Sequence, residues 1–322
     1  MNGPVYASHQ GSSELNSIPP IDLADLRVLV ALADFRHFAK AADACNLSQP
    51  ALSARIRKME HALKTPLVER SRRFEGFTAA GERVLARARQ LLNDVDGLVQ
   101  DAKSGETLSG LLRIGVIPTA TPLAGRLASS LSTVHPNIRL RASSLSSRAI
   151  EQGLKEFALD AGITYLNTEP NPDMKTLPLA RERYCLVGTA QLPGNGTIPL
   201  DWKDLAGVPL ALMTPDMQNR RILNRAFAAA GVEPNVGFEA NSFLAIVSRA
   251  SAGDVAAILP RTMADMVCMD GLARRDLAEL AAPPVIGLIA ARRVPLLPLV
   301  AALWSHAAAC IAESDLASDN PT

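Results

Sequence analysis

The chain has 322 residues, of which 48% are hydrophobic and 20% are charged, and its net charge is +1. This length and composition suit two or three compact lobes, each with its own core, and exclude a single small module. No stretch approaches the roughly 20 apolar residues that a membrane span needs, and the N-terminus lacks the basic start and apolar run of a signal peptide. We therefore expect a soluble cytoplasmic protein without a membrane partner.

The cysteines are widely scattered and show neither a CxxC pair nor the spacing of a disulfide framework. We expect buried, reduced thiols. The alternative is a redox switch, which needs a thiol of low pKa with a second cysteine nearby. The four positions are Cys45, Cys185, Cys268 and Cys310.

Charge is unevenly distributed along the chain. Residues 1–20 are polar and without periodicity, and they predict a flexible tail. Residues 21–92 then hold 13 Lys and Arg against 8 Asp and Glu, although the whole chain is almost neutral. A basic N-terminal quarter on a slightly acidic remainder indicates that one part of the protein meets a polyanion.

Residues 21–78 show helical periods followed by one short extended segment. The segment "DLRVLVALADF" predicts a first helix, and the Ala-rich "HFAKAADACN" predicts a second, which Asn46 can end in a tight turn. A third helix begins after Ser48, a good N-cap, and carries Pro50 in its first turn, where proline's missing N–H costs nothing. Its apolar stripe is formed by Leu52, Ile56, Met59 and Leu63.

The other face of this third helix begins with small and polar residues and continues with basic ones. The following "LVERSRRFEGFT" predicts a short hairpin with a tight tip, a wing beside the helix. Two helices joined by "NLS" and followed by a basic hairpin predict a winged helix-turn-helix that binds double-stranded DNA. The expected DNA-contacting residues are Ser48, Gln49, Pro50, Ser53, Arg55, Arg57, Lys58, Arg72 and Arg73.

A long helix is predicted over residues 79–103. One apolar seam runs along it with charges on both flanks, which favours a partner helix and therefore a homo-oligomer; packing on its own domain is the alternative. The seam consists of Val84, Ala88, Leu91, Val95 and Leu98. The segment "SGETLSG", residues 104–110, predicts a hinge after this helix.

Residues 111–322 alternate short β-like runs with helical patterns, which predicts an α/β effector-binding domain of parallel sheets covered by helices. About 210 residues exceed one typical lobe, so we expect two lobes with a ligand cleft between them. The first is predicted to comprise about 111–181 and 268–322, and the second about 182–267.

Enzymatic chemistry is disfavoured. The chain has no GxSxG, P-loop, GxGxxG after a strand or HExxH, and its five histidines are dispersed, so we expect no catalytic residues, metal or cofactor. A solute-binding or small-molecule enzyme domain with an accessory helical domain is the rival hypothesis, and it predicts no salt-sensitive DNA affinity. A nucleoid-type DNA binder would leave the α/β part unexplained.

The segment "FAKAADACNLSQPALSARIRKMEHALKTPLVERSRRFEGFTAAGERVL" resembles the winged helix-turn-helix of LysR-type transcriptional regulators. The two-lobed remainder is similar to that family's periplasmic-binding-protein-like effector domain, and the resemblance covers about residues 20–310. It implies a cytoplasmic bacterial regulator, a homodimer or homotetramer, that binds promoter DNA and responds to a small-molecule effector. RNA polymerase is a further partner to which the resemblance points.

The resemblance also assigns roles within the DNA-binding part. It places Gln49, Pro50 and Ser53 at the start of the recognition helix, Arg57 or Lys58 on the DNA backbone, and Arg72 or Arg73 of the wing in the minor groove. Many members of the family have arginine at the position of Ala54, so the bases contacted here are expected to differ.

In the effector domain, the strand-to-helix turns that line the family's cleft carry hydroxyls and amides. Hydroxyls and helix N-terminal N–H groups suit an anion, so we expect a small carboxylate or an inorganic anion as effector. For Ser146 and Ser147, helix capping alone is the alternative role. The expected effector-binding residues are Thr119, Thr121, Ser146, Ser147, Gln218, Asn219 and Asn241.

The segments "IGVIPT" and "LSARIRKME" are also similar to the peroxide-sensing branch of the family. That branch senses through a cysteine near the start of a helix in the second lobe. This chain has Gln218 at about that position, with no cysteine within thirty residues on either side. Peroxide sensing is therefore disfavoured.

Overall fold

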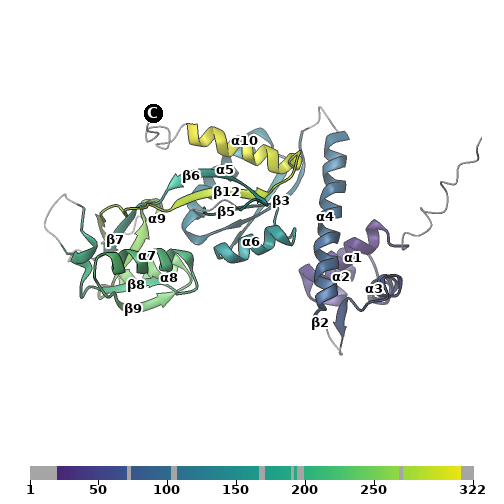
Figure 1. The fold of residues 1–322 in the computed structure, drawn as a ribbon, viewed down its shortest axis with the longest axis horizontal. Coiled ribbons are helices and arrows are strands. Elements are labelled where there is room, and N and C mark those ends of the chain that lie inside the picture. Colours follow the sequence, from purple (N-terminus) through teal and green to yellow (C-terminus); the bar gives the residue numbers. More distant parts are fainter. Residues whose placement is uncertain are drawn as a thin grey trace, which may run out of the picture. The chain divides into compact units, whose positions relative to one another are not determined.

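The structure is a computed structural model that describes residues 20–70, 74–102, 107–166, 171–189, 192–193, 199–267 and 271–312. The chain divides into two compact units, Met1–Asp96 and Gly97–Thr322 (Figure 1). The predicted N-terminal tail lies outside the described residues except for its last position, and so do residues 104–106 of the predicted hinge.

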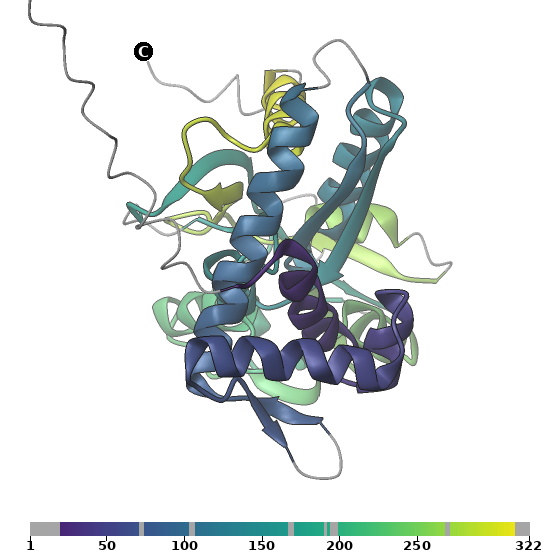
Figure 2. The same cartoon turned by 90° about the vertical axis from the view of Figure 1, so that its right-hand side faces the viewer.

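The first unit gathers three helices and a hairpin around the start of a long fourth helix (Figures 1 and 2). These elements confirm the predicted order of helix, helix, helix, hairpin and long helix. Their bounds are α1 (Leu23–Phe35), α2 (Phe38–Ala44), α3 (Gln49–Leu63), β1 (Val68–Arg70), β2 (Phe74–Phe77) and α4 (Ala79–Ala102).

Local sequence explains where these helices begin and turn. Asp22 caps α1 in a capping box with Asp25. The Ser48 hydroxyl accepts a hydrogen bond from the Ala51 N–H at 3.3 Å, which starts α3 as predicted. Asn46 adopts a φ of 55° between α2 and α3, a conformation that asparagine tolerates better than most residues. These local interactions produce the tight connection of a helix-turn-helix.

The apolar stripe of α3 lies in the core of the first unit. Its three inner residues have no exposed surface, and each contributes about 1.5–3 kcal/mol by burial. Because this stripe packs inward against α1, the opposite face of α3 remains on the surface. The stripe is formed by Leu52, Ile56 and Met59, which meet Leu29 and Leu32 in the same core cluster.

The surroundings of helix α4 differ between its start and its later turns. Near its start a Cβ on Gly81 would lie 2.0 Å from the carbonyl oxygen of Leu67, so only glycine lets the helix pack this closely. Ala88 is buried in the core of the first unit, whereas Leu91 and Leu98 are 51% and 67% exposed. The early part of the predicted seam therefore packs on its own unit, and the later part presents apolar side chains to solvent.

The second unit contains two five-stranded sheets (Figure 1). The first sheet has the order β4-β3-β5-β12-β6; β3 pairs in parallel with β4 and β5, while β12 pairs antiparallel with β5 and β6. The strands are β3 (Gly110–Val116), β4 (Ile138–Ser144), β5 (Ala161–Tyr165), β6 (Met174–Arg181) and β12 (Val285–Ala291). The helices of this lobe are η2 (Pro118–Ala120), α5 (Thr121–Val134), α6 (Ser147–Lys155) and α10 (Pro298–Ala312).

The second sheet has the order β11-β7-β10-β8-β9, with β8 parallel to β9 and β10, and β7 antiparallel to β10 and β11. The strands are β7 (Tyr184–Gly188), β8 (Pro209–Met213), β9 (Asn235–Ala240), β10 (Ala256–Pro260) and β11 (Ala273–Asp276). The helices are η3 (Trp202–Leu205), α7 (Gln218–Ala229), α8 (Phe243–Ser251) and α9 (Arg261–Met266).

Both sheets repeat one arrangement: three parallel strands joined through helices, followed on one side by two strands that form antiparallel pairs. The prediction of parallel sheets was correct for three strands of each sheet and wrong for the other two. The chain crosses between the lobes after Arg181 and returns between β11 and β12, beyond Leu277, which lies in the core of the second lobe. The predicted return at residue 268 is too early, because β11 pairs with β7 in the second sheet.

Burial on both faces explains the short apolar strands of the second lobe. Side chains alternate along a strand, so Ile258 of β10 lies in one core cluster while Ala257 and Leu259 lie in the cluster on the other face. None of the helices in the described part of the chain combines the length and apolar character needed to span a membrane.

Candidate functional site

The exposed face of α3 begins with the residues predicted to contact DNA. Ser48, Gln49 and Pro50 are exposed, and Ser53 is half-buried one turn further on. Arg57 is exposed, and no ion pair involves it among the described residues. The first turns of α3 thus present short side chains, and a guanidinium is available beyond them for a phosphate.

The other two basic residues of this face are held by a buried carboxylate. Asp25 on α1 has no exposed surface, and it pairs with Arg55 at 2.7 Å and Lys58 at 2.8 Å. Burial alone would raise the pKa of the Asp25 carboxyl, but hydrogen bonds from Lys58, the Asp22 backbone and Arg55 lower it. Arg55 and Lys58 therefore tie α3 to α1, a role that the sequence did not predict.

The hairpin β1–β2 pairs antiparallel from Val68 opposite Phe77 to Arg70 opposite Phe74. This confirms the predicted hairpin. The two basic residues assigned to its tip, Arg72 and Arg73, lie outside the described residues.

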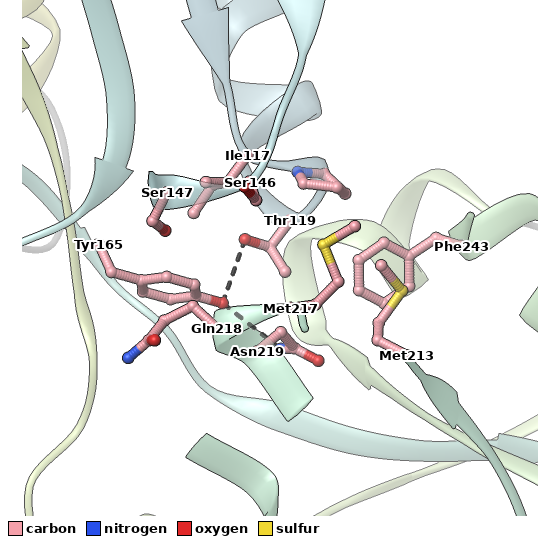
Figure 3. A pocket seen from close by; sticks show the side chains of 11 residues that line it. Ile117, Thr119, Ser146, Ser147, Tyr165, Met213, Met217, Gln218, Asn219 and Phe243 are labelled. Carbon is pink, nitrogen blue, oxygen red and sulfur yellow. Dashed lines mark hydrogen bonds between the residues drawn. The ribbon is translucent and has the colours of Figure 1, made fainter. Parts of the chain in front are cut away.

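A small pocket lies within the second unit, where the parallel strands of both sheets end (Figure 3). In folds of this type ligands bind at the carboxyl ends of the strands, where helices begin. Figure 3 shows Met213, Met217 and Phe243 on one side and the Tyr165 ring on the other, with the Tyr165 hydroxyl directed toward Thr119 and Asn219. The lining residues are Ile117, Pro118, Thr119, Ser146, Ser147, Tyr165, Met213, Met217, Gln218, Asn219 and Phe243.

The structure thus brings five of the seven predicted effector-binding residues together: Thr119, Ser146, Ser147, Gln218 and Asn219. The other two do not line the pocket. Thr121 is exposed, and its hydroxyl donates to the Pro118 carbonyl at 2.9 Å, while Asn241 is exposed beyond the end of β9.

Several polar atoms of this pocket have unused hydrogen-bonding capacity. The Ser147 hydroxyl and the side-chain oxygen of Asn219 are buried and have no partner among the described residues. The Ser146 hydroxyl oxygen accepts from the Ala149 N–H, so its own hydrogen is available to a ligand. Helix α7 begins at Gln218 without a side-chain cap. The two sides of the pocket therefore offer donors near two helix N-termini, where anions bind favourably.

The Thr119 hydroxyl is not available as a hydrogen-bond donor to a ligand. This hydroxyl donates to the Tyr165 hydroxyl at 3.2 Å, and the Thr119 side chain is almost fully buried. It can still accept a hydrogen bond from a ligand, but its proton is already engaged. This contact and a 3.4 Å bond from the Asn219 amide link two lining residues to Tyr165 (Figure 3).

Behind Tyr165 lies a buried carboxylate that the sequence analysis did not identify. Glu182 falls in the crossing between β6 and β7, and its Oε2 accepts from the hydroxyls of Tyr165 at 2.7 Å and Tyr184 at 2.5 Å. Its Oε1 is buried without a partner among the described residues. Burial raises the Glu182 pKa to about 7, against the lowering effect of the hydroxyl groups of Tyr184, Tyr165 and Thr119.

The described cysteines do not lie in the pocket. Cys185 on β7 is buried, and burial raises the pKa of its thiol to about 12. Cys45 lies at the end of α2, where burial also raises the pKa of the thiol. Cys268 is outside the described residues, and Cys310 falls in the last turns of α10.

Two protein families match this chain. Residues 23–82 match the family described as "Bacterial regulatory helix-turn-helix protein, lysR family", and residues 105–310 match the "LysR substrate binding domain". Together the two matches take in the helix-turn-helix and both lobes of the second unit.

Relatives and solved structures agree with these matches. The chain is 34% identical over 243 residues to the DNA-binding transcriptional dual regulator OxyR of Escherichia coli, covering 74% of this chain and 79% of the relative. It is 32% identical over 249 residues to the SDS degradation transcriptional activation protein of a Pseudomonas species, with coverages of 74% and 79%. A full-length OxyR variant from Pseudomonas aeruginosa superposes with a TM-score of 0.74 at 25% identity, covering 89% of this chain and 94% of that one.

The full-length regulator CbnR in complex with its target DNA shares the fold, with a TM-score of 0.65 at 20% identity and coverages of 90% and 99%. The family conclusion rests on three findings: the helix-turn-helix with its exposed α3, the two-lobed α/β unit with a pocket between its sheets, and the family matches to each of these two parts. This chain belongs to the LysR family of DNA-binding transcriptional regulators with an effector-binding domain.

Proposed function

We propose that this regulator responds to a small carboxylate or a similarly small inorganic anion bound between the N-termini of α6 and α7. The observation that carries the proposal is the pair of buried polar atoms without partners in the pocket, the Ser147 hydroxyl and the Asn219 side-chain oxygen. Buried polar atoms are normally hydrogen-bonded, so such a pair indicates groups reserved for a ligand.

The arrangement of donors and acceptors supports a particular kind of carboxylate. The hydroxyls of Ser146 and Ser147 can donate to a carboxylate. The Gln218 side chain can donate as well, through its NH2 group, because its oxygen already accepts a hydrogen bond from Arg221 at 2.8 Å. The Asn219 oxygen can accept from a hydroxyl on the same ligand. A short hydroxy acid such as glycolate satisfies both requirements.

The names of some relatives suggest a different signal. Several are named hydrogen peroxide-inducible genes activators, and the one from Pectobacterium carotovorum is 34% identical over 243 residues. In this chain Gln218 begins α7, and the described thiols have raised pKa values, which disfavours the thiolate that reacts with peroxide. These features support an effector that binds without thiol chemistry.

On the DNA side, we propose that α3 enters the major groove with Gln49, Pro50 and Ser53 foremost, and that Arg57 contacts the phosphate backbone. Arg55 and Lys58 position α3 through Asp25, and the wing adds Arg72 and Arg73. The exposed apolar seam of α4 supports a homodimer, from which a homotetramer can be built. RNA polymerase is the proposed partner through which bound effector alters transcription.

The test is a thermal-shift titration of the full-length protein with formate, acetate, glycolate and inorganic phosphate. A ligand present at about 100 times its Kd stabilises the folded state by about 2.7 kcal/mol, which is several degrees for a domain of this size. We expect glycolate to bind more tightly than acetate. Ser147→Ala should weaken the response, whereas the control Ser132→Ala, which removes an exposed hydroxyl of α5, should retain it. No shift with any of the four would refute the proposed effector class.

A further inference from the structure

No cationic side chain pairs with Glu182 in the part of the chain that the structure describes. The groups that face it are Tyr165 from β5, Tyr184 from β7 and, one hydrogen bond further away, Thr119 from η2 and Asn219 from α7. The guanidinium groups on adjoining segments have other partners: Arg183 pairs with exposed Glu279, Arg220 with Glu239, and Arg261 with Asp276. Among the described residues, the carboxylate is thus held by hydroxyl groups alone.

Tyr165 connects this carboxylate directly to the pocket. Tyr165 lines the pocket, and the same hydroxyl that donates to Glu182 accepts from Thr119 and Asn219. An anion bound in the pocket would therefore lie close to a second negative charge that is itself buried. Charges of like sign at short separation in a buried site repel strongly, and each makes the protonated form of the other more favourable.

The pocket also offers an anion no cationic side chain. None of its lining residues is Lys, Arg or His. The helix N-termini supply only partial positive charges. Some other change must remove the repulsion from Glu182.

We propose that an anionic effector binds in this pocket together with a proton, which Glu182 takes up from solvent. The proposal rests on the proposed function, because it assumes that an anion occupies this pocket. No covalent bond is made or broken; a proton moves from bulk water to a carboxylate oxygen of Glu182, most simply to Oε1, which has no partner. Tyr165 and Tyr184 remain donors to Oε2 in both states.

Linkage sets the direction of the pH dependence. The Glu182 pKa of about 7 in the free protein leaves the group mostly ionised above neutral pH. A bound anion raises this pKa further, so binding takes up protons in the range above about pH 7. The affinity should rise as the pH falls through that range, by at most roughly tenfold per pH unit for one linked proton, and level off below it.

The test is isothermal titration of the full-length protein with glycolate from about pH 6 to pH 9, since glycolate stays ionised throughout this range. At mildly alkaline pH the titration is repeated in HEPES and in Tris, whose different ionisation enthalpies reveal proton uptake. Glu182→Gln keeps the shape of the protonated acid but cannot titrate. It should bind glycolate at every pH about as tightly as the wild type does at its acidic limit, without proton uptake.

Glu279→Gln is the matched control, because Glu279 is an exposed carboxylate on the same crossing region and pairs with Arg183. This variant should keep the wild-type pH dependence. Tyr184→Phe provides a second variant if Glu182→Gln fails to fold. Loss of one hydrogen bond to the carboxylate raises its pKa, so the pH range of the dependence should move upward.

The outcomes separate the two proposals. Glycolate binding with the same pH dependence in the wild type and in Glu182→Gln would overturn the proton coupling and leave the effector site standing. Absence of binding by glycolate, acetate, formate and phosphate would overturn the proposed effector class and the coupling together. A pH dependence present in the wild type and in Glu279→Gln but absent from Glu182→Gln supports both.

Discussion

The Oδ1 atom of Asp25 on α1 lies 2.7 Å from a guanidinium nitrogen of Arg55 on α3, and the whole Asp25 side chain is buried. Lys58 contacts the other carboxylate oxygen one turn later on α3, at 2.8 Å. Two positive charges of the recognition helix are thus committed to holding that helix in place. Arg57, between them in sequence, is exposed and has no such contact among the described residues.

This difference predicts unequal effects of two arginine substitutions on DNA binding. Arg57→Ala should weaken binding to all sequences and reduce the slope of log K against log salt by about 0.9, the value for one phosphate contact. Arg55→Ala should leave the slope nearly unchanged and destabilise the first unit by about 1–3 kcal/mol, because it removes a partner of a buried carboxylate. Fluorescence anisotropy at several salt concentrations and urea unfolding measure both quantities. Equal loss of slope in the two variants would contradict this division of roles.

The exposed part of the α4 seam predicts a second outcome. Leu91→Asp should dissociate the oligomer, because a charge would be buried in an apolar contact between helices. Leu91→Met keeps the side chain apolar and of similar volume, so it should remain associated. Sedimentation equilibrium distinguishes the two. An unchanged oligomer in Leu91→Asp would place the interface elsewhere.

The local sequence predicts this structure correctly where the structure depends on neighbouring residues. The start of α3 depends on Ser48 and Pro50, the turn before it on Asn46, and the strand-to-helix turns on residues close together in the chain. The local sequence does not predict structure where the interacting residues are far apart along the chain. Strand β6 has Pro178 and an irregular burial pattern and pairs only with a strand more than a hundred residues later.

The two buried carboxylates illustrate the same limit. Asp25 looks like an acidic residue in the first turn of a helix, and its cations come 30 and 33 residues later. Glu182 stands between two charged residues in "RERY", which is typical of a solvated loop, and nothing local places it beneath Tyr165. The pocket residues on helix starts were predictable, whereas the carboxylate behind them depends on how the two lobes assemble.

The hydroxyls of the pocket differ in availability, which predicts different costs of removing them. Ser147→Ala removes a buried donor without a partner among the described residues. It should weaken glycolate binding by roughly tenfold, because one hydrogen bond to a charged group is lost. Thr119→Val removes a donor already used by Tyr165, so its effect on glycolate affinity should be smaller. Isothermal titration measures both affinities. A larger loss in Thr119→Val would show that this hydroxyl turns to the ligand.

Cys185 provides a test against thiol-based signalling. Its Sγ lies 3.6 Å from the Leu259 carbonyl in the second sheet, and its raised pKa leaves almost no thiolate at neutral pH. Peroxide treatment of the folded protein should therefore leave this thiol reduced, as measured by mass spectrometry after alkylation in denaturant. Cys185→Ala should retain the glycolate response. Rapid oxidation of Cys185 in the native protein would contradict the burial argument.

The raised pKa of Glu182 also predicts how stability depends on pH in the absence of effector. The folded state holds this proton with a pKa of about 7, against an ordinary value of 4.5, so folding takes up a proton between these values. Stability from this group is therefore fully present below about pH 4.5 and is lost as the pH rises through 7. The full difference corresponds to roughly 3 kcal/mol, as an upper limit for one carboxyl.

Glu182→Gln removes this titration while keeping the volume of the side chain. Relative to the variant, the wild type should lose up to roughly 3 kcal/mol in free energy of unfolding between about pH 5 and pH 8. Other groups titrate equally in both proteins, so the difference between their urea-unfolding curves isolates Glu182. The exposed control Glu279→Gln should parallel the wild type. The contrary outcome is a free energy of unfolding that changes equally with pH in the wild type and in Glu182→Gln. Glu182 would then have an ordinary pKa in the folded protein. A buried carboxylate that is held only by tyrosine hydroxyls is not expected to have one.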